Sequence, residues 1–247
     1  MILYKFRSYE QLHYIADIIV NERLYCSKLD ELNDPFEGHC TRQIKRQIKS
    51  VFESTGEEEN LNFTINEHWT PFHNREESDK IRICSLSGSM SDVRLWSFYG
   101  GSHKGVAIGI ELDVDECFRS DADFGVIKVN SNHTSLPIFE DDGADPNSIP
   151  LRQVVTNKTS IWSYEDEYRI ITSKRFHSVN GKIREIITGP RMTSDEQEVI
   201  SRIAAGVPIF KSRLNPRNLS VEKSNLYDPD HLGKGIREAI SLPISND

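Results

Sequence analysis

Ile161-Trp162-Ser163-Tyr164-Glu165-Asp166-Glu167-Tyr168-Arg169-Ile170-Ile171 places charged residues within an otherwise apolar, aromatic run. Successive side chains of a β-strand point to opposite faces, so a strand over residues 161–171 separates them cleanly. Glu165, Glu167 and Arg169 then share one face, and Asp166 is the exception on the apolar face. The sequence therefore predicts two carboxylates about 7 Å apart, with a guanidinium next in line.

This charged face has two interpretations. Paired carboxylates can bind a polyhydroxyl ligand, orient a nucleophile or stabilise a developing cation. Alternatively, the same residues form the solvated face of an antiparallel strand, which is often wet on one side. Arg169 can keep Glu167 ionised for chemistry, or form with it a purely structural ion pair.

The rest of the chain mixes strands and helices without regular βαβ alternation, which predicts an α+β fold. Expected strands cover residues 2–6, 23–27, 83–87, 106–110, 125–129, 182–187, 207–211 and 219–223. Expected helices cover residues 9–21, capped by Ser8, residues 41–52 and 154–159, and residues 195–204, capped by Ser194. We expect a mixed or antiparallel split sheet with the helices packed on it.

The chain has 247 residues and contains no Pro, Gly and Ser linker that would divide it, so we expect one domain over residues 1–225. A polar insertion with partial helix is expected near residues 53–80. Residues 130–150 read as a long flexible loop or a lid. Residues 226–247 are expected to be a loosely attached tail.

Composition narrows the classes of partner. The net charge of −8 disfavours generic binding to the phosphates of nucleic acid. The four cysteines form no C-x-x-C pair, so no zinc site or disulfide framework is expected, and we expect no metal ligands. No apolar run reaches the length of a signal peptide or a membrane span, which predicts a cytoplasmic protein without a membrane partner.

Asn33-Asp34-Pro35-Phe36-Glu37 has the pattern of a helix start. Asp34 would be the N-cap, Pro35 the first helical residue, and Glu37 would reach back to the cap. We favour this interpretation over direct contact of Asp34 with a ligand. The helix expected at residues 41–52 would carry a basic stripe, interpreted as a solvated face, at Arg42, Lys45, Arg46 and Lys49.

A second distinctive stretch is Leu95-Trp96-Ser97-Phe98-Tyr99-Gly100-Gly101-Ser102-His103-Lys104-Gly105. The glycine pair permits a tight turn or close approach of a ligand. Trp96 and Tyr99 can share a helical face and stack on a ring, although core packing is the favoured interpretation of Trp96. His103 and Lys104 can form an anion-binding corner or a surface turn.

Several separated motifs together resemble the domain-of-unknown-function family 2971 over roughly residues 2–220. They are Leu3-Tyr4-Lys5-Phe6, Asn33-Asp34-Pro35-Phe36-Glu37, Trp96-Ser97-Phe98-Tyr99 with His103-Lys104-Gly105-Val106, Lys158 with Trp162-Ser163-Tyr164-Glu165-Asp166-Glu167-Tyr168-Arg169, and Gly189-Pro190. The family implies no assigned activity.

The opening Leu3-Tyr4-Lys5-Phe6-Arg7-Ser8, followed by a helix and then Leu24-Tyr25-Cys26-Ser27, is similar to the first strand and helix of ADP-ribosyltransferase-like folds. In those enzymes a histidine or arginine of the first strand helps to hold NAD, and a later Glu-x-Glu pair orients the ribose and the nucleophile. The resemblance implies Glu167 and Glu165 as catalytic residues. It implies an NAD site formed by Tyr4, Lys5, Arg7, Trp96, Tyr99, His103, Lys104 and Arg169. Lys5 replaces the usual histidine, which favours binding over turnover.

Three functions follow as hypotheses. The first is an ADP-ribosyltransferase-like enzyme that uses NAD to modify a macromolecular acceptor, as a toxin or phage-defence effector. The second is a module of the same fold that binds a nucleotide or a protein partner without chemistry. The third is a hydrolase or nuclease that holds a divalent metal with Glu165, Glu167 and Asp34.

Overall fold

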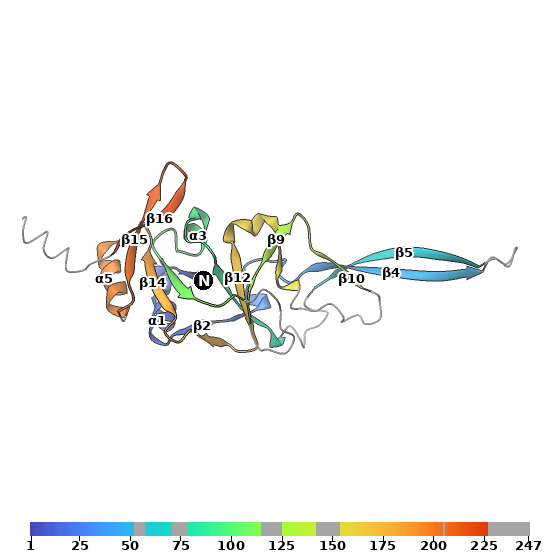
Figure 1. Cartoon of the computed structure of the whole chain (residues 1–247), viewed down its shortest axis with the longest axis horizontal. Coiled ribbons are helices and arrows are strands. Elements are labelled where there is room, and N and C mark those ends of the chain that lie inside the picture. Colours follow the sequence, from blue (N-terminus) through green and yellow to red (C-terminus); the bar gives the residue numbers. More distant parts are fainter. Residues whose placement is uncertain (52–57, 71–78, 115–124, 142–153, 205, 227–247) are drawn as a thin grey trace, which may run out of the picture. The chain divides into compact units, whose positions relative to one another are not determined.

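The computed structural model describes residues 1–51, 58–70, 79–114, 125–141, 154–204 and 206–226 (Figure 1). Contacts between Cα atoms divide the chain into two compact units. The first contains residues 1–24, 86–112 and those from 178 onward, and the second contains residues 25–85 and 113–177. Each unit is assembled from separate segments of sequence, so no single linker separates them.

The first unit is built on a mixed sheet. Its strands lie in the order β16 (Ser220–Leu226), β15 (Ile209–Asn215), β14 (Ile183–Thr188), β7 (Val106–Glu111) and β1 (Ile2–Arg7). β14 and β15 run parallel, whereas the other pairs are antiparallel. β7, which lies between β14 and β1, is apolar and buried from Val106 to Ile110, as expected for a strand covered on both faces.

Helices supply apolar side chains to the first unit. After η1 (Tyr9–Gln11), α1 (Leu12–Val20) buries Ile15, Ile18 and Ile19, and α5 (Ser194–Ile203) buries Ile200. Each fully buried Ile contributes about 1.5–3 kcal/mol. α3 (Val93–Phe98) begins after Asp92, whose carboxylate accepts the amide of Arg94.

The second unit contains several smaller strand groups. β6 (Arg82–Ser87), whose last two residues belong to the first unit, lies beside β12 (Glu167–Thr172), which pairs antiparallel with β8 (Gly125–Lys128). β4 (Cys40–Val51) and β5 (Glu58–Trp69) form a long two-stranded ribbon (Figure 1), with β10 (Ile138–Asp141) parallel to β4. Short strands complete the set: β2 (Arg23–Tyr25) with β13 (Phe176–Ser178), β3 (Ser27–Lys28) with β6, and β9 (Asn130–His133) with β11 (Asn157–Thr159).

The mixed α and β class predicted from the sequence is confirmed, with strands far more abundant than helices. Most expected strands lie within two or three residues of their positions, and Ser8 caps the first helical turn as predicted. The cap of α5 is Thr193 rather than Ser194, because Thr193 and Glu196 form a reciprocal capping box. The ADP-ribosyltransferase-like topology stays a prediction.

Two expected helices are strands. Residues 41–52 were predicted as a helix with a basic stripe, but β4 covers residues 41–51 and pairs with β5 along its whole length, while residue 52 lies outside the described residues. The helical spacing of the lysines and arginines therefore carries no meaning there, because a strand repeats every two residues. The helix expected at residues 154–159 is replaced over its second half by β11, which pairs with β9.

Two segments expected to be irregular contain strands. The insertion near residues 53–80 holds β5, and the loop 130–150 begins with β9 and β10. Residues 52–57, 71–78 and 142–150 of these segments, and residues 227–247 of the expected tail, lie outside the described residues.

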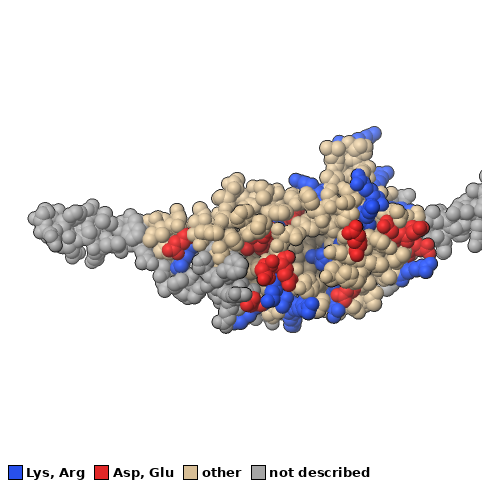
Figure 2. All heavy atoms as spheres, turned by 180° about the vertical axis from the view of Figure 1, so that it is seen from behind, with Lys and Arg blue, Asp and Glu red and all other residues tan. Residues whose placement is uncertain are grey.

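None of the described helices is long and apolar enough to cross a membrane. On the face drawn in Figure 2, Lys and Arg side chains lie interspersed with Asp and Glu among the described residues.

Candidate functional site

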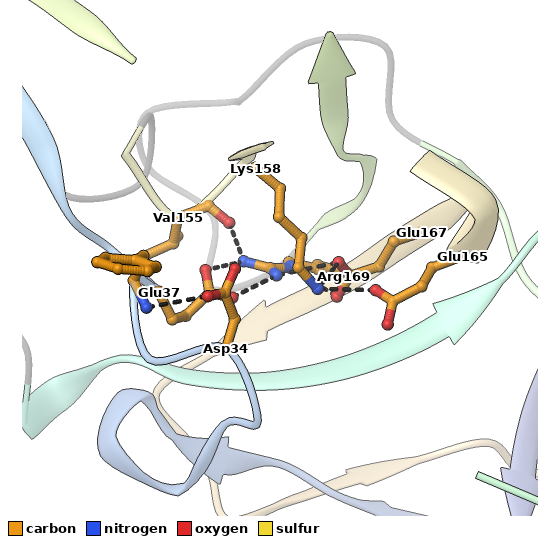
Figure 3. Close-up of polar contacts among 8 residues, drawn as sticks. Asp34, Glu37, Val155, Lys158, Glu165, Glu167 and Arg169 are labelled. Atoms are coloured by element: carbon orange, nitrogen blue, oxygen red, sulfur yellow. Dashed lines mark hydrogen bonds and ion pairs between the residues drawn. The ribbon is translucent and has the colours of Figure 1, made fainter. Parts of the chain in front are cut away.

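The strongest concentration of buried charge lies in the second unit, around Arg169 on β12 (Figure 3). Arg169 is 1% exposed, and its guanidinium is surrounded by acceptors. Nη1 and Nη2 donate to Oε1 and Oε2 of Glu37 at 2.6 and 2.8 Å. Nε and Nη2 donate to Oε1 and Oε2 of Glu167 at 2.8 and 3.0 Å. Nη1 also donates to the carbonyl of Val155. The planar, five-donor guanidinium suits this double bidentate arrangement, which an ammonium cannot reproduce.

Lys158 on β11 is the second cation. Its ammonium donates to Oε2 of Glu165 at 2.7 Å and to Oε2 of Glu167 at 3.1 Å. It also lies 4.7 Å from the centre of the Trp162 ring, within the range of a cation–π contact. Three carboxylates therefore face two cations, and all five side chains are buried.

The third carboxylate, Glu37, comes from a turn rather than from a helix. Asp34 accepts the amide of Phe36 at 2.9 Å through its side chain, and its carbonyl accepts the amide of Glu37. Gly38 then takes φ 73°, which ends the turn. The prediction that a helix starts at Asp34 is wrong. Glu37 does not reach back to cap a helix but binds Arg169.

The buried charges fix one another's protonation. Burial alone would raise the pKa of Glu167, but the charges of Arg169 and Lys158 outweigh it, with hydrogen bonds from Arg169 and Ser85, and lower the pKa to about 2. Burial opposes the charge of both cations, yet the carboxylates raise the pKa of Lys158 and of Arg169. Glu167 is therefore ionised at neutral pH and is a weak proton acceptor.

The single strand predicted over residues 161–171 is wrong in its first half. Residues Ser160–Glu165 form the 3-10 helix η4, Asp166 adopts the left-handed conformation with φ 42°, and β12 starts at Glu167. Glu165 therefore reaches the cluster from the end of η4, and only Glu167 and Arg169 share a strand face. The predicted meeting of the three residues is nevertheless observed, through Lys158. The face is buried, so the interpretation as a solvated face is wrong.

The other predicted site residues belong to the first unit. Tyr4, Lys5 and Arg7 lie on β1. The Tyr4 hydroxyl donates to Oε1 of Glu185 at 2.9 Å, and Lys223 binds the other oxygen of Glu185 at 2.8 Å. Burial, followed by Glu185, raises the pKa of Tyr4. Arg7 places its guanidinium 5.7 Å from the centre of the Tyr14 ring.

Trp96 and Tyr99 end in different environments on α3. Trp96 is fully buried, packs edge-on against Phe6 with ring centres 5.1 Å apart, and donates its indole N–H to the Met90 carbonyl at 2.7 Å. Its ring is thus part of the core, as the favoured interpretation predicted. Tyr99 is the half-buried C-cap of α3.

His103 and Lys104 lie in a tight turn of the first unit. Ser102 and His103 both take positive φ, and Nε2 of His103 lies 3.0 Å from the Ser97 hydroxyl. Burial, and then the charge of Arg191, lower the pKa of His103. Lys104 is exposed. The structure thus groups Glu165, Glu167 and Arg169 in one unit and the remaining predicted residues in the other.

Sequence reasoning missed the roles of Glu37 and Lys158. Both were noted, Glu37 as a capping residue and Lys158 as a motif residue, yet neither was predicted as a partner of the Glu165 and Glu167 pair. A signal did exist: charged residues recur inside apolar stretches, where a buried charge needs a partner of opposite sign. Spacing could not reveal the pairing, because Glu37 and Arg169 are 132 residues apart.

Comparisons with models of known protein families, with curated proteins and with solved structures find no match to this chain.

Proposed function

We propose that this chain works by binding a protein partner rather than by catalysis, with the buried ion cluster as its scaffold. One observation carries the proposal. Glu167 is 3% exposed, and both of its oxygens are bound by Arg169 and Lys158. A carboxylate held in this way has neither the access nor the basicity that a nucleophile or a general base needs.

The cluster instead fixes two surface segments. Glu37 ties the turn of residues 34–38 to Arg169, and the Lys158–Glu165 pair joins β11 to the last residue of η4. Each segment presents a large apolar side chain to solvent: Phe36 is 57% exposed and Ile161 is 71% exposed. Rigid loops with exposed apolar side chains suit protein recognition, because little ordering entropy is lost when the partner binds.

Cross-linking in cells that contain the partner tests this proposal with matched variants. Phe36→Ser and Ile161→Ser should each remove the partner that wild type captures. Val20→Ser, at a 63% exposed position of the first unit, should retain it. All three variants should keep the wild-type melting temperature, since exposed positions change stability by less than about 0.5 kcal/mol. Partners recovered equally with every variant would contradict the proposal.

A second candidate is ADP-ribosyl transfer from NAD, the activity that the sequence resemblance implies. One observation supports it: Lys158 holds the Glu165 and Glu167 carboxylates side by side. A carboxylate near the ribose would stabilise the positive charge that develops as nicotinamide leaves. This function requires the substrate to displace Lys158 from Glu167. Membership of the domain-of-unknown-function family 2971 and an ADP-ribosyltransferase-like fold are likewise proposals.

Nicotinamide release from NAD separates the two candidates. Binding without chemistry predicts no release by wild type or by Glu167→Gln, measured without added metal. Release by wild type that disappears in folded Glu167→Gln would show that Glu167 acts in the cleavage of NAD and would overturn the first proposal; ADP-ribose found on a macromolecular acceptor, rather than free in solution, would identify a transferase. A rise of the wild-type melting temperature with NAD, without release, would instead identify a nucleotide as the ligand.

A further inference from the structure

Two histidines meet at the base of the β4–β5 ribbon, within the second unit. His39 directly precedes β4, and His68 pairs in register with Thr41, one residue before the end of β5. Nδ1 of His39 lies 3.3 Å from Nε2 of His68. The ring centres are 5.2 Å apart and the planes are tilted by 52°, so the nitrogens approach each other without ring stacking.

We propose that His39 and His68 bind a divalent transition-metal ion of the zinc class through Nδ1 and Nε2. A tetrahedral ion with bonds of about 2.0–2.1 Å to nitrogen holds two ligand nitrogens about 3.3–3.4 Å apart. The observed separation meets that requirement, and it is long for a hydrogen bond, whose donor and acceptor usually lie about 2.7–3.2 Å apart. Imidazole is a preferred ligand of zinc, nickel and copper.

The surroundings favour a cation on neutral rings. Burial, and then the charge of the neighbouring His68, lower the pKa of His39, which favours the uncharged ring. The negative charges of Asp34 and Glu37 act in the opposite direction and raise the pKa of His39. The same charges add negative potential that favours a cation at the site. The next residue, Cys40, is fully buried.

The site is held by structure that does not depend on the ion. The β4–β5 ladder fixes His68, and the amide of His39 donates to the Phe36 carbonyl at 2.9 Å. Phe36 also packs edge-on against the His39 ring. Among the described residues, no three His, Cys, Asp or Glu side chains converge on one point. With two protein ligands, a tetrahedral ion would keep two positions for water or an incoming ligand, one more than zinc sites with three protein ligands leave.

Cobalt titration of the whole chain, purified without a histidine tag and stripped with a chelator, tests the site. Wild type should bind one Co²⁺, visible as d–d absorption, and Zn²⁺ should displace it. His39→Gln and His68→Gln should each weaken binding at least about tenfold, equivalent to about 1.4 kcal/mol. His13→Gln, an exposed imidazole on α1, should leave binding unchanged.

Circular dichroism establishes whether each variant is folded. If His39→Gln does not fold, His68→Gln alone tests metal binding, because His68 is exposed and its replacement should not disturb the fold. Unchanged Co²⁺ binding in folded His68→Gln, or no saturable binding by wild type, would overturn the proposal. Phe36 contacts the His39 ring, so Ile161→Ser is the variant that tests partner capture without altering the contacts of His39, and either proposal can fail alone.

Discussion

Arg169 and Glu37 form a buried pair in which both terminal nitrogens of the guanidinium bind both oxygens of the carboxylate, at 2.6 and 2.8 Å. Their side chains are 1% and 3% exposed. The pair joins a turn near the start of the second unit to a strand near its end. Because Arg169 also binds Glu167, removal of its guanidinium leaves two buried carboxylates without that partner.

Arg169→Ala should therefore be severely destabilising. Breaking a buried ion pair from one side typically costs about 3–5 kcal/mol, because the remaining charge stays desolvated. Urea unfolding followed by circular dichroism measures the loss. Arg184→Ala is the control: Arg184 pairs with Glu111 at the surface, with side chains 46% and 52% exposed, and such pairs contribute about 0–1 kcal/mol. Equal effects of the two substitutions would show that the cluster is not a scaffold.

Acid should unfold this protein partly through Glu167. Its pKa is lowered in the folded chain to about 2, from an ordinary value near 4.5. Because the pKa of Glu167 is lower in the folded chain than in the unfolded chain, ionised Glu167 stabilises the folded state fully at pH values above the unfolded-chain pKa. This stabilisation is lost as the pH falls from about 4.5 towards 2. The shift corresponds to about 3 kcal/mol.

The measurement is the free energy of unfolding of wild type and Glu167→Gln between pH 7 and pH 3. The stability advantage of wild type should be constant down to about pH 5 and should shrink below it. A difference that is independent of pH over the whole range would mean that Glu167 does not ionise as its surroundings require.

The sequence predicted individual helices and strands better than the pairing between segments that are distant in sequence. Apolar runs and helical spacing located β1, α1, β7, β14 and α5. The helix prediction for residues 41–52 was wrong because the apolar and basic residues there fit a helical period. Pairing of β4 with β5 makes the segment a strand instead. That pairing partner lies in a polar segment with little periodic signal.

The candidate site was predicted in its members but not in its assembly. Glu165, Glu167 and Arg169 were expected to meet, and they do, although by way of a 3-10 helix, a left-handed Asp166 and Lys158. Glu37 and His68 illustrate the limit. Their partners Arg169 and His39 are distant in sequence, and a long-range contact between single residues leaves no periodic pattern.

Gly189 shows how the Gly-Pro motif acts in the first unit. Its amide donates to the Gly105 carbonyl at 2.8 Å, and a Cβ at this position would overlap the carbonyl of His103. The required feature is therefore close approach of two backbones. Gly181 is glycine for another reason: its φ is +66°, and a Cβ there would meet nothing within 4 Å.

These two glycines should respond differently to the same added methyl group. Gly189→Ala must move backbone, which cannot yield as a flexible side chain does, so we expect a loss of about 3 kcal/mol or more in the free energy of unfolding. Gly181→Ala should cost only the left-handed penalty of about 1–2 kcal/mol. Urea unfolding of the two variants beside wild type measures both. If Gly189→Ala proves no more destabilising than Gly181→Ala, the 103–105 turn does not pack against Gly189 as tightly as its hydrogen bond indicates.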